Sequence, residues 1–512
     1  MICIETKVKL PFLWGRQAFQ KTNWAQINLI VGPNGSGKTL LASELAEQFS
    51  AAGHPVEFLR SDRTEQEGHL TKLKEDSEIR RKVEMVLSNM FGKSIRFEER
   101  ADDSVVPLVA DTARNVEYGL RDGECHGLKE ILTLLVSLYS STSGCLILDE
   151  PELHLHPQFQ LFFMNEIRKV AASDSRRIFF LITHSPFFID LRFPEDLIGV
   201  VVCHSNRAPT HIESLSDEDE AMFCRFLPRF NTYHKQFFFS DNQIFVEGYT
   251  DQQLFSNLLG CIENPQDSAG TGIIDVGGKD ELGVFFKVCS LLGTDGRIIT
   301  DLDSLFCGKL RDVVCADSRP ARWLEKQHEK QLPFYRSAFT KKEVQQDITL
   351  ERLIQKLEAL LAAVGKSVCE TDGSFSAEIR LFVGKVKELH EKHENAGALD
   401  TFKTVVLQGV TRLDWKLADI LPVPVAATLP LIKNLANLIF AAAEAARVYI
   451  LPGGCIEHYY KRNKIDYMPV SAKDRLFHTE LEYIITAPLR ELRTEYPELI
   501  HILRRACMKF PV

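Results

Sequence analysis

A glycine-rich run at 32–39, GPNGSGKT, has the spacing of a phosphate-binding loop, with an apolar run at 27–31 before it and a helix-forming run at 40–46 after it. The predicted nucleotide contacts are Asn34, Gly35, Gly37, Lys38 and Thr39. Lys38 would reach the β- and γ-phosphates, and Thr39 would hold Mg²⁺. The other interpretation is a glycine-rich turn with an incidental lysine, but the strand–loop–helix context favours the nucleotide site.

Two carboxylates follow the apolar run at 145–148, where a nucleotide-hydrolysing site needs them. We expect Asp149 to hold Mg²⁺ and Glu150 to act catalytically on the attacking water, because hydrolysis needs one group for the metal and another for the nucleophile. Gly123 precedes the apolar helix expected at 128–139, where free backbone N–H groups can bind an anion. His184 follows another apolar run and is predicted to sense the γ-phosphate.

A second set of acids stands at strand ends in the middle of the chain. Glu247 follows the run 243–246, Asp251 lies one helical turn later, and Asp301 and Asp303 follow the run 297–300. Carboxylates at strand ends are common solvated caps, so each alone is a weak signal. Gathered in one small volume, however, they repel one another unless a divalent metal neutralises them. The set therefore predicts a divalent-metal site.

The elements that must position this second set alternate between strand and helix. Strands are expected at 243–246, 272–276 and 297–300, with helices around 254–258 and 282–292 and the tight turn VGGK at 276–279 between them. This alternation predicts a parallel sheet whose carboxyl ends carry the acids.

Residues 1–200 resemble an ABC-type ATPase head of the RecF/SMC kind. LDEPELHLHP at 148–157 is similar to the Walker B segment of its compact, AAA-like members, and His184 matches the switch histidine. Gly123-Glu124 resembles a signature motif in which Asp122 replaces the usual serine. The resemblance implies ATP-linked dimerisation of heads, and it gives no metal-binding role to His154 and His156.

The strand-end acids resemble the Toprim fold, and an ATPase head followed by a Toprim unit resembles the OLD (overcoming lysogenization defect) family of ATP-dependent endonucleases. The resemblance implies that Glu247, Asp251, Asp301 and Asp303 are metal ligands, the first, third and fourth also catalytic. It returns near the C-terminus, at 451–460 and 471–473. There it implies a further metal ligand, Glu457, and a catalytic basic residue, Lys473, that stabilises developing phosphate charge. Lys461, Lys464 and Arg475 are alternatives to Lys473.

Length and composition agree with a multidomain globular protein. The chain has 512 residues, 45% hydrophobic and 26% charged, which predicts two to four domains. Its net charge of -9 excludes a protein that is basic as a whole, so DNA contact requires local basic patches. The 12 cysteines show no C-x-x-C spacing, which favours a reduced cytoplasmic setting over a zinc or disulfide framework. No secretory signal is recognised, and the apolar stretch at 431–451 is interpreted as a buried helix, so no membrane partner is expected.

The predicted fold class is α/β, with a P-loop ATPase head and a Toprim domain that carries an α-helical insertion. The expected boundaries are an ATPase head at 1–215, a solvated linker at 216–240, a first Toprim part at 241–304, the insertion at 305–449 and a second Toprim part at 450–512. About 84 residues separate Thr39 from Gly123, too few for the long coiled-coil arm of a chromosome organiser.

Two helical stripes of apolar residues predict the core of the insertion, beginning at Leu350 and at Ile379. Its leading segment, 309–344, has an excess of Lys and Arg with aromatic residues between them. DNA backbone contact and a solvated helix face explain this segment equally well.

The predicted function is an ATP-regulated, Mg²⁺- or Mn²⁺-dependent DNA endonuclease that assembles through its heads into a homo-oligomer. Kinship with the OLD family implies bacterial defence against phage, with a separate partner protein or a retron in some relatives. The alternative is an ATP-dependent DNA-binding or clamp-type repair ATPase with a non-catalytic Toprim domain. A topoisomerase is a weaker alternative, because no domain with a nucleophilic tyrosine is recognised.

Overall fold

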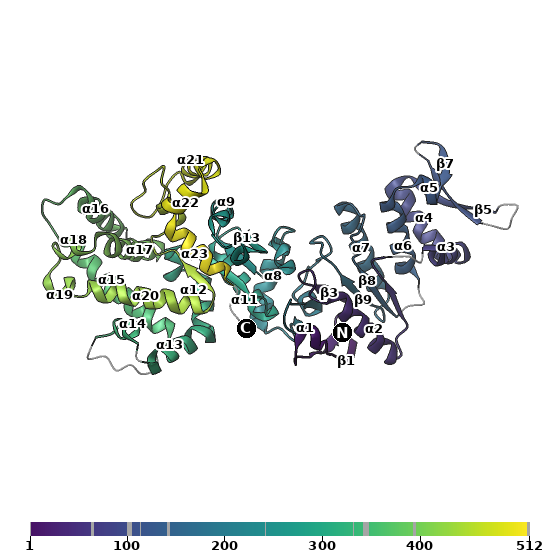
Figure 1. Cartoon of the computed structure of the whole chain (residues 1–512), viewed down its shortest axis with the longest axis horizontal. Coiled ribbons are helices and arrows are strands. Elements are labelled where there is room, and N and C mark those ends of the chain that lie inside the picture. The colour runs from purple at the N-terminus through teal and green to yellow at the C-terminus, as the bar shows by residue number, and fades with distance from the viewer. Residues whose placement is uncertain are drawn as a thin grey trace. The chain divides into compact units, whose positions relative to one another are not determined.

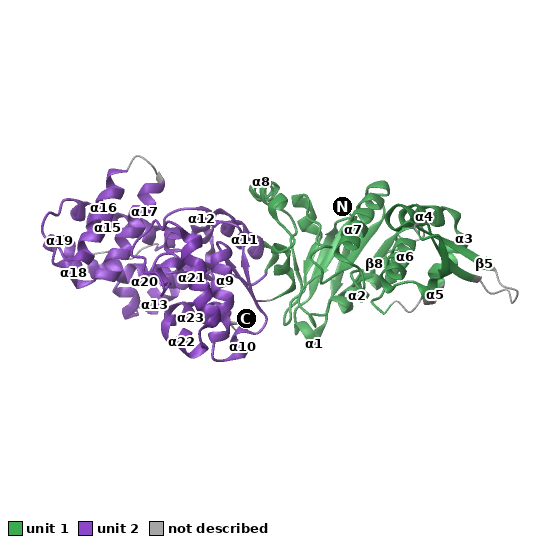
Figure 2. Cartoon of the chain, turned by 90° about the horizontal axis from the view of Figure 1, so that it is seen from above, with its two compact units in different colours: residues 1–241, 291–293 green, residues 242–290, 294–512 purple. Residues whose placement is uncertain are grey.

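The computed structural model divides into two compact units, each described here by itself (Figure 2). Unit 1 comprises 1–241 with 291–293, and unit 2 comprises 242–290 with 294–512. The structure describes the following residues: 2–62, 66–99, 105–112, 114–140, 144–240, 242–330, 332–340, 348–392 and 396–508. Both units are built on a largely or wholly parallel sheet with helices, which confirms the predicted α/β class.

The central sheet of unit 1 has six strands in the order β11-β10-β3-β9-β8-β4, parallel except for the β10–β11 pair. The strands are β3 (Ile27–Val31), β4 (Val56–Leu59), β8 (Cys145–Asp149), β9 (Ile178–Ile182), β10 (Val200–Val202) and β11 (Thr210–His211). All residues of β8 and β9 are buried. Their continuous apolar runs are typical of parallel strands that are covered on both faces.

Helix α2 (Lys38–Ala51) follows β3 and buries Leu41, Leu45 and Phe49 in the core of unit 1. The Trp24 ring packs edge to face on Phe49 and on Phe180 of β9. Trp24 ends β2 (Phe19–Trp24), which pairs antiparallel with β1 (Ile2–Val8). The β1–β2 pair therefore packs through Trp24 against α2 and β9.

Between β4 and β10, unit 1 has a further set of elements besides the main-sheet strands β8 and β9 (Figure 1). It contains an antiparallel sheet of three strands with five helices around it and beside the main sheet. These elements are α3 (Gln66–Glu75), α4 (Ser77–Phe91), β5 (Lys93–Glu99), β6 (Val105–Asp111), β7 (Val116–Gly119), α5 (Leu120–Gly123), α6 (His126–Tyr139) and α7 (Pro157–Ser173). In the described part of the interval from Thr39 to Gly123, the longest helix has 15 residues, so no long arm is present there.

The stretch 216–240, expected to be a solvated linker, is helical. It forms α8 (Asp217–Phe226), η2 (Leu227–Arg229) and η3 (His234–Phe239), and it belongs to unit 1. The acidic residues lie in the first turn of α8, where their negative charges stabilise the helix by interacting with its dipole. The phenylalanines that follow them, including Phe223 and Phe237, are buried and fold the segment onto the unit.

The sheet of unit 2 has four parallel strands in the order β13-β12-β14-β15. They are β12 (Asn242–Val246), β13 (Thr271–Asp275), β14 (Gly296–Thr300) and β15 (Val448–Ile450). Helix α9 (Tyr249–Leu258) connects β12 to β13 with η4 (Leu259–Cys261) and α10 (Pro265–Ser268), and α11 (Lys279–Leu292) connects β13 to β14. The predicted alternation of strand and helix is confirmed, and the carboxyl ends of β12 and β14 lie side by side.

A helical segment separates β14 from β15, as predicted for the insertion. Its helices are α12 (Lys309–Ala316), α13 (Ser318–Lys330), α14 (Pro333–Arg336), α15 (Leu350–Cys369), α16 (Ala377–Glu391), α17 (Ala396–Leu413), α18 (Trp415–Ala418), α19 (Val423–Ala426) and α20 (Leu429–Ala445). The stripes expected from Leu350 and from Ile379 are buried, except for the partly exposed Leu360. The chain then returns to the sheet and ends in α21 (Lys473–Thr486), α22 (Leu489–Glu495) and α23 (Pro497–Cys507), after η6 (Ile456–Tyr459).

One helical stretch in the described part of the chain, Val423–Ala445, is long and apolar enough to cross a membrane by length and composition alone. Core helices of soluble proteins pass the same test. Helix α20, the main part of this stretch, packs against α13, α15 and α17 and against β15, and it buries Ile432, Leu435 and Ile439. These contacts favour the predicted interpretation as a core helix.

Candidate functional site

The glycine-rich loop lies between β3 and α2, and its glycines adopt backbone angles that other residues rarely reach. Gly35 and Gly37 have φ of 77° and 85°. Lys38 begins α2, and its ammonium donates to the carbonyl oxygens of Gly32 (3.2 Å) and Pro33 (2.9 Å). Burial lowers the pKa of Lys38, and nearby acids offset only part of that effect. The lysine is therefore folded back onto the loop, where a phosphate would exchange with these carbonyl contacts.

Thr39 and Asp149 meet although 110 positions separate them. Thr39 Oγ1 donates to Asp149 Oδ2 at 3.0 Å, because the loop after β3 and the end of β8 open at the same edge of the sheet. Burial, together with the charge of Glu150, raises the pKa of Asp149. Its other oxygen, Oδ1, is buried and accepts no hydrogen bond from a described residue. A buried carboxylate with an unused oxygen beside a threonine hydroxyl fits a divalent cation.

Glu150 and His184 lie at the ends of the adjacent strands β8 and β9. The Glu150 backbone has a φ of 48°, and its N–H donates to the carbonyl oxygen of Ile182 at 2.8 Å. Burial and the nearby Lys38 charge lower the pKa of His184 to about 4, so its ring is neutral at ordinary pH. Both residues therefore stand at the same edge of the sheet as Thr39 and Asp149.

Glu152 is a residue of this site for which the sequence predicted no role. Its Oε1 accepts the backbone N–H of His184 (2.6 Å), and its Oε2 accepts the Thr183 hydroxyl (2.8 Å). Burial raises the pKa of Glu152 against the effect of these hydrogen bonds. The residue lies within the acidic segment at 148–157, but only the folded chain shows that its carboxylate holds the His184 turn.

Replacement of Glu152 by alanine is expected to destabilise unit 1 and to slow ATP hydrolysis. Two buried donors lose a charged acceptor, which costs about 2–4 kcal/mol and lowers the Tm by about 4–10 °C. Thermal unfolding and an ATPase assay measure the two effects. Glu44→Ala, at an exposed position of α2, is the matched control, and an equal Tm for the two variants would contradict the assigned role.

Among the described residues, the structure records no contact between Gly123 and the loop at 32–39. Gly123 ends α5, beside β7 and apart from the start of α2 (Figure 1). The neighbouring Glu124 accepts hydrogen bonds from Lys93 (2.5 Å) and Tyr118 (2.6 Å). Burial opposes ionisation of Glu124, but these bonds outweigh it and lower its pKa to about 2.

His154 and His156 have structural contacts. The His154 ring lies 5.5 Å from the His126 ring, and His156 Nδ1 accepts the Gln158 N–H at 3.3 Å to cap α7. They are absent from the single group of potential metal ligands found among the described residues.

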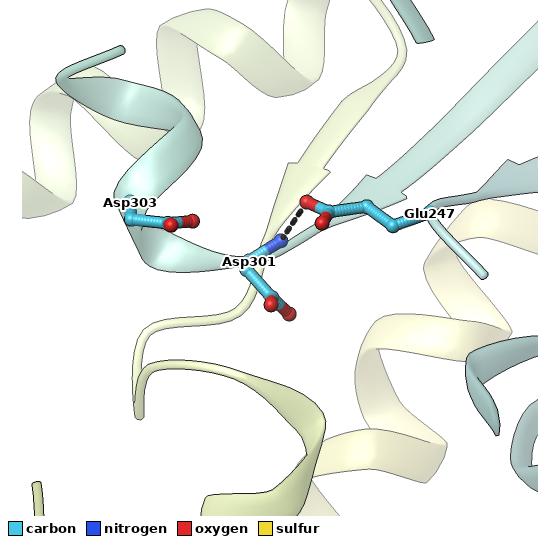
Figure 3. Close-up of side chains that lie close together, drawn as sticks. All are labelled: Glu247, Asp301 and Asp303. Atoms are coloured by element: carbon cyan, nitrogen blue, oxygen red, sulfur yellow. Dashed lines mark hydrogen bonds between the residues drawn. The ribbon is translucent and has the colours of Figure 1, made fainter. Parts of the chain in front are cut away.

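That group is Glu247, Asp301 and Asp303, at the carboxyl edge of the sheet in unit 2 (Figure 3). One ligand atom from each residue lies within 4.8 Å of the others. Glu247 follows β12 and reaches across to the end of β14, where its Oε1 accepts the Thr300 hydroxyl (2.8 Å) and the Asp301 N–H (3.3 Å). Parallel pairing of β12 with β14 places the two strand ends together, so the predicted convergence is observed.

Asp251, Glu457 and Lys473 extend this acid cluster. Asp251 lies in the first turn of α9, and the charges of Glu247 and Glu457 act on it. Glu457 has a side chain that is only 1% exposed, and its Oε1 lies 2.8 Å from the Lys473 ammonium. Its Oε2 is buried and accepts no hydrogen bond within the described part of the chain. The orphaned oxygen again fits a cation.

Among the four basic candidates near the C-terminus, Lys473 makes the ion pair recorded for Glu457. Lys461 instead lies over the Tyr496 ring, with its ammonium 5.8 Å from the ring centroid. Burial opposes the charge of Lys473, but Glu457 outweighs it, so the lysine stays protonated with a raised pKa. The sequence alone left this choice open.

The central acids of the cluster repel one another. Burial raises the pKa of Asp301 well above its ordinary value, and the charges of Glu247, Asp251 and Asp303 raise it further. Burial, followed by the charges of Glu247 and Glu457, raises the pKa of Asp251 to about 7. A divalent cation would remove this repulsion, which is the physical argument that the acid cluster fits a metal.

The acid cluster predicts a pH-dependent response to Mg²⁺ or Mn²⁺. Because the folded-state pKa values of Asp251 and Asp301 are raised, these acids cost no stability below about pH 4 and destabilise the metal-free fold increasingly as the pH rises. At about a 100-fold excess of metal over its Kd, we expect the Tm to rise by about 5 °C near pH 8 and by much less near pH 5. Differential scanning fluorimetry measures both shifts, and the same shift at both pH values would contradict the electrostatic argument.

Lys279 is the second residue that the sequence did not assign. It lies in the VGGK turn that was predicted between two strands, and its ammonium is 2.5 Å from Asp303 Oδ1. The signal available beforehand was the motif itself, but nothing local indicates which acid the lysine meets.

In the described part of the basic segment at 309–344, two arginines form ion pairs and one aromatic ring is buried. Arg311 pairs with Glu358 (3.1 Å) and Arg319 with Asp317 (2.8 Å), while the Tyr335 ring is fully buried. Lys341 and Lys342 lie outside the described residues. Two of the basic side chains are thus held in ion pairs, and DNA backbone contact and a solvated helix face stay the two interpretations of the segment.

Comparisons with known proteins match both units. Residues 238–303 match the family model "Overcoming lysogenization defect protein-like, TOPRIM domain", and residues 56–190 match "AAA domain, putative AbiEii toxin, Type IV TA system". The OLD nuclease of Thermus scotoductus (strain ATCC 700910 / SA-01) is 26% identical over 216 residues, which cover 41% of this chain and 39% of that protein. The chain thus matches about two fifths of the length of this curated relative.

Two solved structures are also similar to part of the chain. The SMC head domain from Thermotoga maritima is 12% identical, with 42% of this chain and 100% of that chain covered and a TM-score of 0.28. The crystal structure of the complex of archaeal ribosomal stalk protein aP1 and ribosome recycling factor aABCE1 gives 14% identity, 40% and 41% coverage and a TM-score of 0.25. The AAA match at 56–190 begins after the loop at 32–39 and covers Asp149, Glu150 and His184, and the Toprim match at 238–303 covers Glu247, Asp301 and Asp303. The chain therefore carries a segment that matches an AAA domain model, followed by a segment that matches an OLD-like Toprim domain model.

Proposed function

We propose that this protein is an ATP-regulated, divalent-metal-dependent DNA endonuclease. The observation that carries the proposal is the convergence of Glu247, Asp301 and Asp303 within 4.8 Å at the edge of a parallel sheet. Supporting it are the OLD-like Toprim match and the similarity to a protein named OLD nuclease. Bound divalent ions would activate the attacking water and stabilise the leaving oxygen of the phosphodiester.

The residues divide between two sites in this proposal. Glu247, Asp251, Asp301, Asp303 and Glu457 would hold Mg²⁺ or Mn²⁺, and Lys473 would stabilise developing phosphate charge. In the ATPase domain, Thr39 and Asp149 would hold the nucleotide's Mg²⁺, Lys38 would bind phosphate and Glu150 would orient water. The loop residues Asn34, Gly35 and Gly37 and the sensor His184 complete the nucleotide site. Gly123 would serve the nucleotide of another head, because it does not meet the loop of its own chain.

The wider setting is part of the same proposal. The chain would divide into a head at 1–215 and a Toprim domain in two parts, 241–304 and 450–512, around the insertion at 305–449. The heads would form a homo-oligomer on binding ATP. A cytoplasmic role in bacterial defence against phage, with or without a separate partner protein or retron, follows from the kinship with OLD proteins.

A plasmid assay tests the proposal most directly. Supercoiled plasmid is incubated with the full chain in Mg²⁺, Mn²⁺ or Ca²⁺, with and without ATP, and nicked and linear products are resolved on a gel. We expect products in Mg²⁺ or Mn²⁺, with an amount that changes on addition of ATP. ATP-dependent gel shift of DNA without nicking in any metal would overturn the proposal and support the clamp-type DNA-binding ATPase.

A further inference from the structure

Lys279 is positioned by a turn that only glycine allows. Gly277 and Gly278 have φ of 76° and 142°, and together they turn the chain from β13 into α11. Lys279 is the first residue of α11, and its stem runs beside Gly308, where an added Cβ would lie 3.9 Å from Lys279 Cε. Backbone from both sides thus directs the ammonium to the acid cluster.

The Lys279 ammonium forms an ion pair with Asp303, a contact that the sequence did not predict. The ion pair joins the Lys279 ammonium and Asp303 Oδ1 at 2.5 Å, and both side chains are mostly shielded, at 21% and 24% exposed. A lysine side chain is protonated at ordinary pH, and this ammonium lies in direct contact with Asp303. Lys279 therefore remains a full positive charge beside an expected metal ligand.

The acid cluster consequently has a lysine at each of two members. Asp303 pairs with Lys279 at the start of α11, and Glu457 pairs with Lys473 at the start of α21. No lysine ion pair is recorded among the described residues for the other three acids of the cluster, Glu247, Asp251 and Asp301. The group whose ligand atoms lie within 4.8 Å of one another includes Asp303, so an ion held by this group meets the positive charge of Lys279 already in place.

We propose that Lys279 is a positioning residue that holds Asp303 and competes with a divalent ion for its carboxylate, so that it sets the metal affinity on that side of the cluster. The inference rests on the proposed metal-dependent function and deepens it, because it names a residue that regulates metal binding at that site. Removal of the ammonium leaves Asp303 uncompensated and strengthens metal binding, whereas a merely structural lysine would leave the affinity unchanged or weaken it.

The test is Mn²⁺ binding by the full chain without DNA and without ATP, measured by isothermal titration calorimetry. An Asp149→Asn background removes an expected metal ligand of the nucleotide site and so excludes Mn²⁺ binding there. In that background we expect Lys279→Gln to lower the Kd for Mn²⁺ by about tenfold or more, and Lys279→Arg, which keeps the charge, to bind as the parent does. Lys287→Gln, on the same helix, is the matched control for general loss of a positive charge.

A double-mutant cycle identifies Asp303 as the partner. The tightening caused by Lys279→Gln should vanish when Asp303 is replaced by asparagine. An unchanged Kd in Lys279→Gln, an equal tightening in Lys287→Gln, or a tightening that persists in Asp303→Asn would each overturn the inference. Failure of the proposed function looks different: the parent would then bind no Mn²⁺ at the cluster, and Asp301→Asn would have no effect on binding. Circular dichroism of each variant establishes that it is folded.

Discussion

Asp301→Asn is expected to abolish DNA nicking, with a loss of at least about a thousandfold, while ATP hydrolysis continues at the rate of the unaltered protein. Asp301 is a buried member of the acid cluster, and the charges of four other carboxylates, Glu247, Asp251, Asp303 and Glu457, act on it. Asparagine has nearly the same shape but carries no charge, so it removes the metal attraction without opening a cavity. Because ATP hydrolysis depends on residues of unit 1, the substitution should separate the two activities.

Initial rates of plasmid nicking and of phosphate release measure the two activities on the same preparation. Asp312→Asn, at an exposed position of α12, is the matched control and should nick normally. Asp301→Asn should also be more stable than the unaltered protein without metal above about pH 7, since it lacks a buried repelled charge. Nicking at the parent rate by Asp301→Asn would refute catalysis by this acid cluster.

Lys38→Ala is expected to reduce ATP hydrolysis by at least about a hundredfold. The ammonium is the positive side-chain charge that the loop offers to the phosphates, and it is held in place by the carbonyl oxygens of Gly32 and Pro33. Alanine leaves the loop backbone and the start of α2 intact. The loss should therefore appear in phosphate release and in nucleotide affinity, and not in the folded structure.

The same variant shows how the nucleotide acts on the Toprim site. If ATP regulates nicking through this loop, the nicking rate of Lys38→Ala should no longer respond to added ATP. Lys9→Ala, at an exposed position directly after β1, provides the control for charge removal. ATP hydrolysis by Lys38→Ala at the parent rate would show that the loop at 32–39 is not the nucleotide site.

The predictions from sequence that the structure confirms depend on short stretches of chain. The strands at 243–246 and 297–300 and the helix after the loop at 32–39 follow from local apolar patterns and from glycines that permit unusual backbone angles. The convergence of Glu247 with Asp301 follows almost directly, because parallel strands end at one edge. The stretch 216–240, predicted as a linker, shows the complementary limit: its acidic start is local, but the burial of Phe223 and Phe237 depends on tertiary packing.

By itself, the sequence determined which kinds of chemistry this protein carries, since a phosphate-binding loop and acids at strand ends are specified by residue type and spacing. Only the tertiary structure decided which side chains meet across long separations: Glu152 with the His184 turn, Lys473 with Glu457, and Lys279 with Asp303. Such pairs depend on strand register and on how helices pack over the sheet. A few ångströms of displacement in either would give each lysine a different acid, and no local pattern records that choice.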